Sequence, residues 1–189
     1  MSARDELGRR DRRGLPACSL AVVGGVRFEV GNAGTTQEVG SLPDAPWCSA
    51  VLVRPPATPV GAIVICPPVL DEVARDLHRE LEIARALATH GYFVLRFDYR
   101  SSGDSEGDDA SLEFERMVED VGSAIDAATS ETGVDSVTLL GVRVGALAAA
   151  VAAARHAAAV RLVLVDPVAS GSAWVRERYR AERLRKLDP

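Results

Sequence analysis

The chain of 189 residues has few cysteines, no excess of basic side chains and no long apolar segment. Its three cysteines, Cys18, Cys48 and Cys66, form no CxxC pair, so the sequence predicts neither a disulfide framework nor a metal site, and no cofactor is expected. Acidic residues outnumber basic ones by 27 to 22, which argues against nucleic-acid binding because phosphate contacts need a basic face. No apolar run reaches the roughly 18 residues of a membrane-spanning helix. These absences predict a cytoplasmic protein without a membrane span.

The composition is that of a folded protein, with 47% hydrophobic and 26% charged residues. At about 150 residues per domain, the length predicts one domain. Residues 1–20 hold two pairs of arginines and are predicted to form a mobile charged tail, and residues 21–189 to form the domain. No apolar segment precedes Cys18, so no secretion signal is expected.

Short apolar runs alternate with amphipathic segments along the chain. Residues 62–66 (AIVIC) are continuously apolar, which is typical of a strand buried on both faces of a parallel sheet. Strands are predicted at 22–23, 26–30, 50–53, 62–66, 92–97, 137–140 and 162–165, helices at 73–90, 112–129, 146–159 and 172–187, and a loop at 31–46. This order predicts an α/β fold, a mostly parallel sheet with helices on both faces.

In such a fold, ligands bind beyond the carboxyl ends of the strands. Three loops are expected there, at residues 67–75, 98–109 and 141–145. The first contains Val69, Asp71 and Glu72, and the third contains Arg143 and Val144. These loops are where a functional site is predicted.

Three stretches together resemble the α/β-hydrolase family, in its serine-aminopeptidase-like and esterase-like branch. Residues 63–68 (IVICPP) resemble the strand and loop that supply half of the oxyanion hole. Residues 97–107 (FDYRSSGDSEG) resemble the family's Asp-x-Arg-Gly-x-Gly-x-Ser loop, with Ser101 in place of the first glycine. Residues 139–146 (LLGVRVGA) resemble the strand, elbow and helix that present the nucleophile. The resemblance implies a three-layer α/β-hydrolase-like sandwich, without the strands that the family has after the position of Pro189.

The elbow departs from the family at its central residue. The family pattern is Gly-x-Ser-x-Gly, in which the serine attacks the substrate, and Arg143 stands in its place. A guanidinium stays protonated in proteins and cannot act as a nucleophile. The family also places an acid and then a histidine after the elbow, where this chain has only Asp166 and, within the alanine-rich segment, His156. The triad cannot be assembled in that order.

A narrower resemblance is to the exosortase-system-associated hydrolase-like proteins. It depends on Pro67-Pro68, the Asp71-Glu72 pair, the Gly-x-Arg-x-Gly-Ala elbow and residues 166–168 (DPV). The resemblance implies a role near exopolysaccharide or surface-protein sorting.

Two interpretations of Arg143 stay open. At the first turn of a helix the macrodipole disfavours a cation by roughly 0.3–1 kcal/mol, so an ion pair with Glu72 or Asp71 is expected to offset that cost. Alternatively, Arg143 and the helix N-terminus bind a carboxylate or phosphate ligand. The backbone N–H groups of Val144 and Val69 are candidates for holding an oxygen of a ligand, because Pro68 has no N–H.

Ser105 also has two interpretations. Together with Asp98 and Gly103, it is predicted to shape a tight turn through local hydrogen bonds. As a displaced nucleophile it would need a base within about 3 Å, and no base is evident in the sequence.

Three hypotheses for function follow. The first is a hydrolase-derived protein without catalysis that binds a small anionic or acyl-type ligand, or a protein partner. The second is an active esterase, peptidase or acyltransferase that uses a residue outside the elbow, and the third is an N-terminal piece of a longer hydrolase. A homodimer through an exposed last strand or through the C-terminal helix is also predicted.

Overall fold

The computed structural model describes residues 27–29, 34–42 and 45–185. Seven strands form one sheet in the order β1-β2-β3-β5-β4-β6-β7. The strands are β1 (Arg27–Glu29), β2 (Thr36–Leu42), β3 (Ala45–Arg54), β4 (Gly61–Cys66), β5 (Tyr92–Phe97), β6 (Ser136–Val142) and β7 (Ala159–Val165). The helices are α1 (Asp71–Thr89), α2 (Phe114–Thr132), α3 (Val144–Arg155), α4 (Gly171–Arg185) and the short 3-10 turn η1 (Asp109–Ser111).

The sheet has an antiparallel part and a parallel part. β1, β2 and β3 pair antiparallel, and β3 pairs antiparallel with β5. The strands β5, β4, β6 and β7 pair parallel in that order. In this pairing Ala62 of β4 lies opposite Val137 of β6, and Val137 lies opposite Val160 of β7. The carboxyl ends of these four strands therefore meet along one edge of the sheet.

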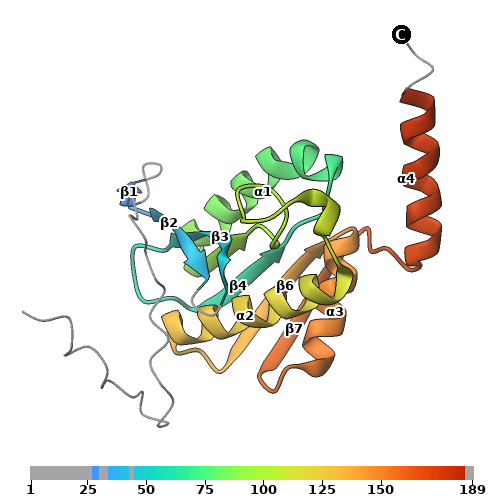
Figure 1. Ribbon diagram of the computed structural model, residues 1–189. Coiled ribbons are helices and arrows are strands. Elements are labelled where there is room, and N and C mark those ends of the chain that lie inside the picture. The colour runs from blue at the N-terminus through green and yellow to red at the C-terminus, as the bar shows by residue number, and fades with distance from the viewer. Residues whose placement is uncertain (1–26, 30–33, 43–44, 186–189) are drawn as a thin grey trace, which may run out of the picture.

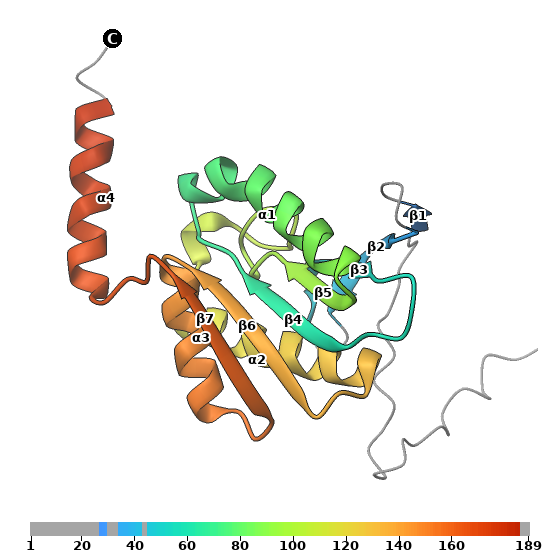
Figure 2. The same ribbon diagram turned by 180° about the vertical axis from the view of Figure 1, so that it is seen from behind.

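Helices cover both faces of the sheet (Figures 1 and 2). On one face α1 packs through Ala84 and Ala88 against Ile63 and Val94. On the other face, α2 and α3 bury a larger core, which includes Ile125 and Ala149. The alanine side chains of α3 let it approach the sheet closely. The predicted fold class, a mostly parallel α/β sheet with helices on both faces as in an α/β-hydrolase-like sandwich, is confirmed.

β7 forms an edge of the sheet and is poorly covered. Its four apolar residues from Leu162 to Val165 are each between 41% and 47% exposed. Val163 pairs with Leu140 on the face that carries α1, and in Figure 2 no helix lies over this part of that face. Among the described residues, no helix is long and apolar enough to cross a membrane.

The sequence prediction failed mainly in the antiparallel part. Residues 31–46 were predicted to be a loop, but β2 lies within this range and β3 begins at Ala45. β2 (TQEVGSL) is a largely polar strand, and pairing with β3 holds it in place rather than an apolar pattern of its own. The predicted strand at 22–23 and the predicted tail at 1–20 lie outside the described residues. On α1, Leu77 lies at helical spacing from the buried Ala84 but is itself 45% exposed.

Candidate functional site

The elbow between β6 and α3 has a constrained backbone. Arg143 is the N-cap residue of α3, with φ 54° and ψ −120°. A Cβ on Gly145 would lie 2.2 Å from the carbonyl oxygen of Pro67, and one on Gly141 would lie 2.5 Å from the Cα of Ala146. Both glycines of the Gly-x-Arg-x-Gly pattern are therefore needed because neighbouring backbone comes too close for a side chain.

Strained backbone gathers at the carboxyl edge of the parallel strands. Among the described residues, the non-glycine residues with positive φ are Leu70, Ser101, Arg143 and Asp166. Each lies in the segment that follows one of the four parallel strands, in the order β4, β5, β6 and β7. Such conformations cost about 1–3 kcal/mol each and cluster at functional sites. This is also the edge at which the sequence predicts a functional site.

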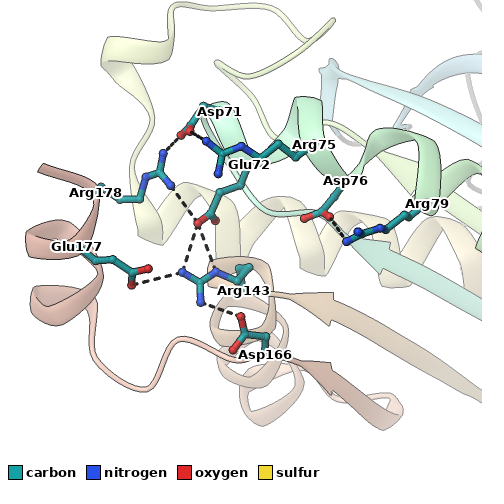
Figure 3. A network of polar contacts seen from close by, with 9 residues as sticks. All are labelled: Asp71, Glu72, Arg75, Asp76, Arg79, Arg143, Asp166, Glu177 and Arg178. Carbon is teal, nitrogen blue, oxygen red and sulfur yellow. Dashed lines mark hydrogen bonds and ion pairs between the residues drawn. The ribbon is translucent and has the colours of Figure 1, made fainter. Parts of the chain in front are cut away.

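Arg143 is held by three carboxylates (Figure 3). Its Nε and Nη2 both donate to Oε1 of Glu72 at 3.3 Å. Its Nη1 donates to Oδ2 of Asp166 at 3.0 Å, and Nη2 lies 3.5 Å from Oε2 of Glu177 on α4. Desolvation lowers the pKa of Arg143, but Glu72 and Asp166 outweigh it and raise that pKa above its ordinary value. The predicted ion pair with Glu72 is confirmed, and the guanidinium stays charged.

Asp71, the other predicted partner of Arg143, binds different arginines. Its carboxylate accepts from Nη2 of Arg75 at 2.9 Å and from Nη2 of Arg178 on α4. Nη1 of Arg178 also donates to Oε1 of Glu72, at 3.4 Å. Glu72 is buried, and its Oε2 has no hydrogen-bond partner among the described residues. We call this set the elbow network; it consists of Asp71, Glu72, Arg75, Arg143, Asp166, Glu177 and Arg178.

An apolar hollow of about 330 Å³ lies beside the elbow. Its lining consists of Val69, Leu70, Leu112, Phe114, Met117, Val144 and Trp174. Val144 is the first residue of α3, so its N–H has no partner within the helix. Among the described residues, neither the Val69 N–H nor the Val144 N–H takes part in a loop or turn hydrogen bond. The structure thus brings both predicted oxygen-binding residues to the wall of one hollow.

Ser105 is tied to the backbone. Its hydroxyl donates to the carbonyl oxygen of Asp98 at 2.8 Å and accepts from the N–H of Ser49 at 2.8 Å. The Asp98 carboxylate accepts from the N–H of Asp104, and Gly103 has φ 57° with no room for a Cβ against Asp98. Burial raises the pKa of Asp98, although the Asp104 N–H lowers it. These contacts favour the structural interpretation of Ser105.

None of the three histidines takes part in the elbow network. His156 is the C-cap of α3, at the end of that 12-residue helix opposite Arg143, and its Nε2 lies 3.1 Å from Asp126 of α2. A helix of that length spans about 18 Å. His90 caps the far end of α1, and His78 is exposed and pairs with Glu82. The described residues include no cluster of three or more potential metal ligands.

Sequence reasoning missed the role of α4 at this site. For this helix the sequence predicts only a contact in a homodimer. In the structure Val175 and Tyr179 are exposed, whereas Trp174 lines the hollow. The i, i+3 and i+4 spacing of Trp174, Glu177 and Arg178 is the signal that places these three on one helix face.

The family model described as "Serine aminopeptidase, S33" matches residues 57–186. The chain belongs to the α/β-hydrolase family. A search of curated proteins gives no match.

Solved structures agree on the fold of this α/β-hydrolase chain. A serine hydrolase without a lid from Xanthomonas campestris matches with a TM-score of 0.57 and 22% identity over 76% of this chain and 66% of its own. Esterase B from Lactobacillus rhamnosis, inhibited by a phosphonate, has a TM-score of 0.55 and 19% identity over 76% and 52%. A thermostable carboxyl esterase from Bacillus coagulans, in complex with glycerol, has a TM-score of 0.50 and 19% identity over 74% and 43%. The chain thus spans about two fifths to two thirds of these proteins, and their likeness shows the fold alone.

Proposed function

We propose that this α/β-hydrolase chain binds an acyl-type ligand at the elbow and does not form an acyl-enzyme. The observation that carries the proposal is the hollow, whose wall combines Val69 and Val144 with apolar side chains. The N–H groups of Val69 and Val144 would donate to the ligand's carbonyl oxygen, and the hollow would bury its apolar chain. A volume near 330 Å³ lies at the lower end for small-molecule sites, which suits a short chain.

The charges of the elbow network favour an acyl ligand over an anionic one. The network contains three arginines, Arg75, Arg143 and Arg178, and four carboxylates, from Asp71, Glu72, Asp166 and Glu177. The sum, 3 − 4 = −1, leaves no surplus positive charge for an added anion. A neutral carbonyl oxygen avoids this repulsion and still receives backbone donors.

The proposal excludes the family's covalent step because Arg143 occupies the nucleophile's position. The guanidinium cannot lose a proton to become a nucleophile, and it is engaged with carboxylates. The Ser105 hydroxyl, for its part, is bonded to backbone on both sides.

Methyl hexanoate is a suitable probe, because binding and cleavage can be measured on the same molecule. We expect it to raise the melting temperature through preferential binding to the folded state, with no release of methanol and no labelling by a serine-reactive phosphonate. Leu112→Trp should fill the hollow and abolish the shift. Val60→Trp, at a 71% exposed position in the turn before β4, is the matched control and should keep the shift.

Two outcomes would overturn the proposal. Turnover of the ester, or a phosphonate label on Ser105 that denaturation prevents, would make the chain an enzyme. If the melting temperature does not shift, or if Leu112→Trp leaves the shift intact, the ester does not bind in this hollow.

Other hypotheses from the sequence stay predictions, namely the exosortase-associated role, the cytoplasmic location, a protein partner and the homodimer. The exposed apolar residues of β7 support an edge contact between copies. Sedimentation of the wild type and of Val163→Lys tests this contact, because a lysine on the face of an edge strand disfavours pairing.

A further inference from the structure

One wall of the hollow belongs to a helix that follows an exposed segment. Trp174 comes from α4, whereas the other lining residues come from the loop after β4, from α2 and the segment before it, and from α3. The chain is anchored as far as Val168, which is buried and whose N–H donates to the carbonyl oxygen of Arg143 at 3.3 Å. Residues 169–171 are exposed, and a Cβ on Gly171 would meet no atom within 4 Å. The position of α4 therefore depends on contacts that the helix itself makes.

The apolar packing of α4 onto the rest of the protein is small. Trp174 is partly buried and packs against the larger core. The described side chains from Val175 to Glu177 and from Tyr179 onward are exposed. Figures 1 and 2 show most of α4 standing away from the sheet and from the other helices. Trp174 alone supplies too little packing to fix a helix of 15 residues.

Ion pairs supply the remaining hold on α4. Arg178 binds both acidic residues in the first turn of α1, Asp71 and Glu72, and Glu177 lies 3.5 Å from Arg143. In Figure 3 both side chains extend from α4 toward α1 and the elbow. Among the described residues, these two supply all the ion pairs between α4 and the rest of the protein. The side chains of Arg178, Asp71 and Glu177 are 20%, 35% and 66% exposed, so dissolved salt can screen these pairs.

We infer that Arg178 is a positioning residue for the ligand and that its ion pairs make binding in the hollow sensitive to salt. By holding α4 against α1, Arg178 keeps Trp174 in the wall of the hollow. A ligand in the hollow gains apolar contact only while that wall is in place, so its apparent affinity scales with the fraction of molecules in which α4 is held. The inference rests on the proposed function, which places the acyl ligand in this hollow, and it adds a regulation of that site.

A neutral ligand makes the test sharp. Methyl hexanoate has no charge for salt to screen, so a hollow with a fixed wall would bind it no more weakly at high salt. We expect its dissociation constant, from calorimetric titration, to rise about fivefold between about 0.05 and 0.5 M sodium chloride. The size follows from weakening ion pairs of this exposure.

Arg178→Ala should weaken binding about fivefold at the lower salt concentration and remove most of the salt dependence. Arg178→Lys keeps the charge and should restore much of both. Arg176→Ala is the matched control, because Arg176 is exposed on the same helix and has no ion pair among the described residues. It should bind as the wild type does at each salt concentration.

Tryptophan emission reports the position of α4 without any ligand. The chain has two tryptophans, and Trp47→Phe leaves Trp174 as the sole one. In that background the emission should shift to the red when salt is raised or when Arg178→Ala is added, and Arg176→Ala should leave it unchanged. Far-ultraviolet circular dichroism should show that the fold is kept in each variant.

The outcomes separate this inference from the proposed function. Ester binding that salt and Arg178→Ala leave unchanged, or that Arg176→Ala weakens equally, would overturn the role of Arg178 and leave the acyl site intact. If the emission shifts as expected but methyl hexanoate does not bind at either salt concentration, the proposed function is overturned and the ionic hold on α4 stands.

Discussion

Two arginine–carboxylate networks lie at the carboxyl edge of the sheet. They differ in whether both oxygens of the buried carboxylate have partners. In the first, Asp120 of α2 is fully buried, and both its oxygens are occupied. Oδ1 accepts from Nε of Arg100 at 2.7 Å and lies 2.6 Å from Nη2, while Oδ2 accepts from the Arg100 backbone N–H at 3.0 Å. Arg100 also stacks over the ring of Trp47. This network holds the loop after β5 against α2.

In the elbow network, the buried carboxylate of Glu72 is shared by two arginines, and only one of its two oxygens has a partner. Oε1 of Glu72 receives both Arg143 and Arg178, and Oε2 has no partner among the described residues. The other partners of Arg143 are exposed, Asp166 at 75% and Glu177 at 66% of the side chain. The difference teaches that an ion pair alone does not identify a site. A buried carboxylate whose two oxygens both have partners indicates a structural clamp. Exposed alternative partners and a carboxylate oxygen without a partner indicate a place where contacts can change.

The largest effect should come from breaking the saturated network. Asp120→Asn removes the buried charge partner of Arg100 and leaves it only the exposed Glu119, 3.2 Å from Nη2. Breaking a buried pair costs about 3–5 kcal/mol. Urea unfolding should show that loss in the free energy of unfolding. Asp126→Asn, on the same helix at an exposed ion pair with His156, is the control and should cost under about 1 kcal/mol. Similar costs for the two variants would remove the distinction between the networks.

A smaller effect is expected from the matching change in the elbow network. Glu72→Gln removes the shared charge, but Arg143 retains Asp166 and Glu177, and Arg178 retains Asp71. Because both arginines keep a charge partner and are themselves 20% exposed, neither charge is left buried and unpaired, and we expect a loss of about 1 kcal/mol in the free energy of unfolding. The same urea titrations measure it. A loss as large as that of Asp120→Asn would mean that the elbow network is a structural clamp as well.

The sequence predicted those features that depend on the pattern of residue types along the chain. The continuous apolar run at 62–66 predicted β4, the strand predicted at 92–97 is β5, and the helix predicted at 73–90 matches α1 within two residues at each end. The resemblance to the family's elbow implied the turn at 141–145, and the helix dipole predicted an ion pair of Arg143 with Glu72 or Asp71, of which Glu72 is found. Each of these follows from local geometry or from the meeting of parallel carboxyl ends.

The parts that could not be predicted depend on long-range partners. β2 is polar, and pairing with β1 and β3 makes it a strand. The hydrogen bonds of Ser105 reach Ser49, 56 residues away, and Arg178 reaches Asp71 across 107 residues. Residue types and spacing show that Ser105 or Arg178 can form contacts, but only the fold decides with which partner.

The smallest effect concerns backbone strain, which both networks share. Ser101, next to Arg100, has φ 63°, and Arg143 has φ 54°. Ser101 stands where the family's loop has glycine, the residue for which positive φ carries no steric cost. For a residue with a Cβ this conformation costs about 1–2 kcal/mol, part of which the greater freedom of glycine in the unfolded chain offsets. Ser101→Gly should therefore raise the free energy of unfolding by about 0.5 kcal/mol.

The urea midpoint, at an unchanged slope, measures this gain. The control is Ser102→Gly, one residue on, because Ser102 is not among the residues with positive φ and should lose about 0.5–1 kcal/mol from added unfolded-state freedom. Arg143→Gly relieves the same kind of strain at the elbow but removes the ion pairs to Glu72 and Asp166. Its net effect on the free energy of unfolding therefore shows which is larger, the relieved strain or the lost ion pairs. If Ser101→Gly destabilises the protein as Ser102→Gly does, positive φ at this edge carries no strain energy. In that case the clustering of such residues at the carboxyl ends would no longer support the elbow as the functional site, and the hollow beside Trp174 would carry the argument alone.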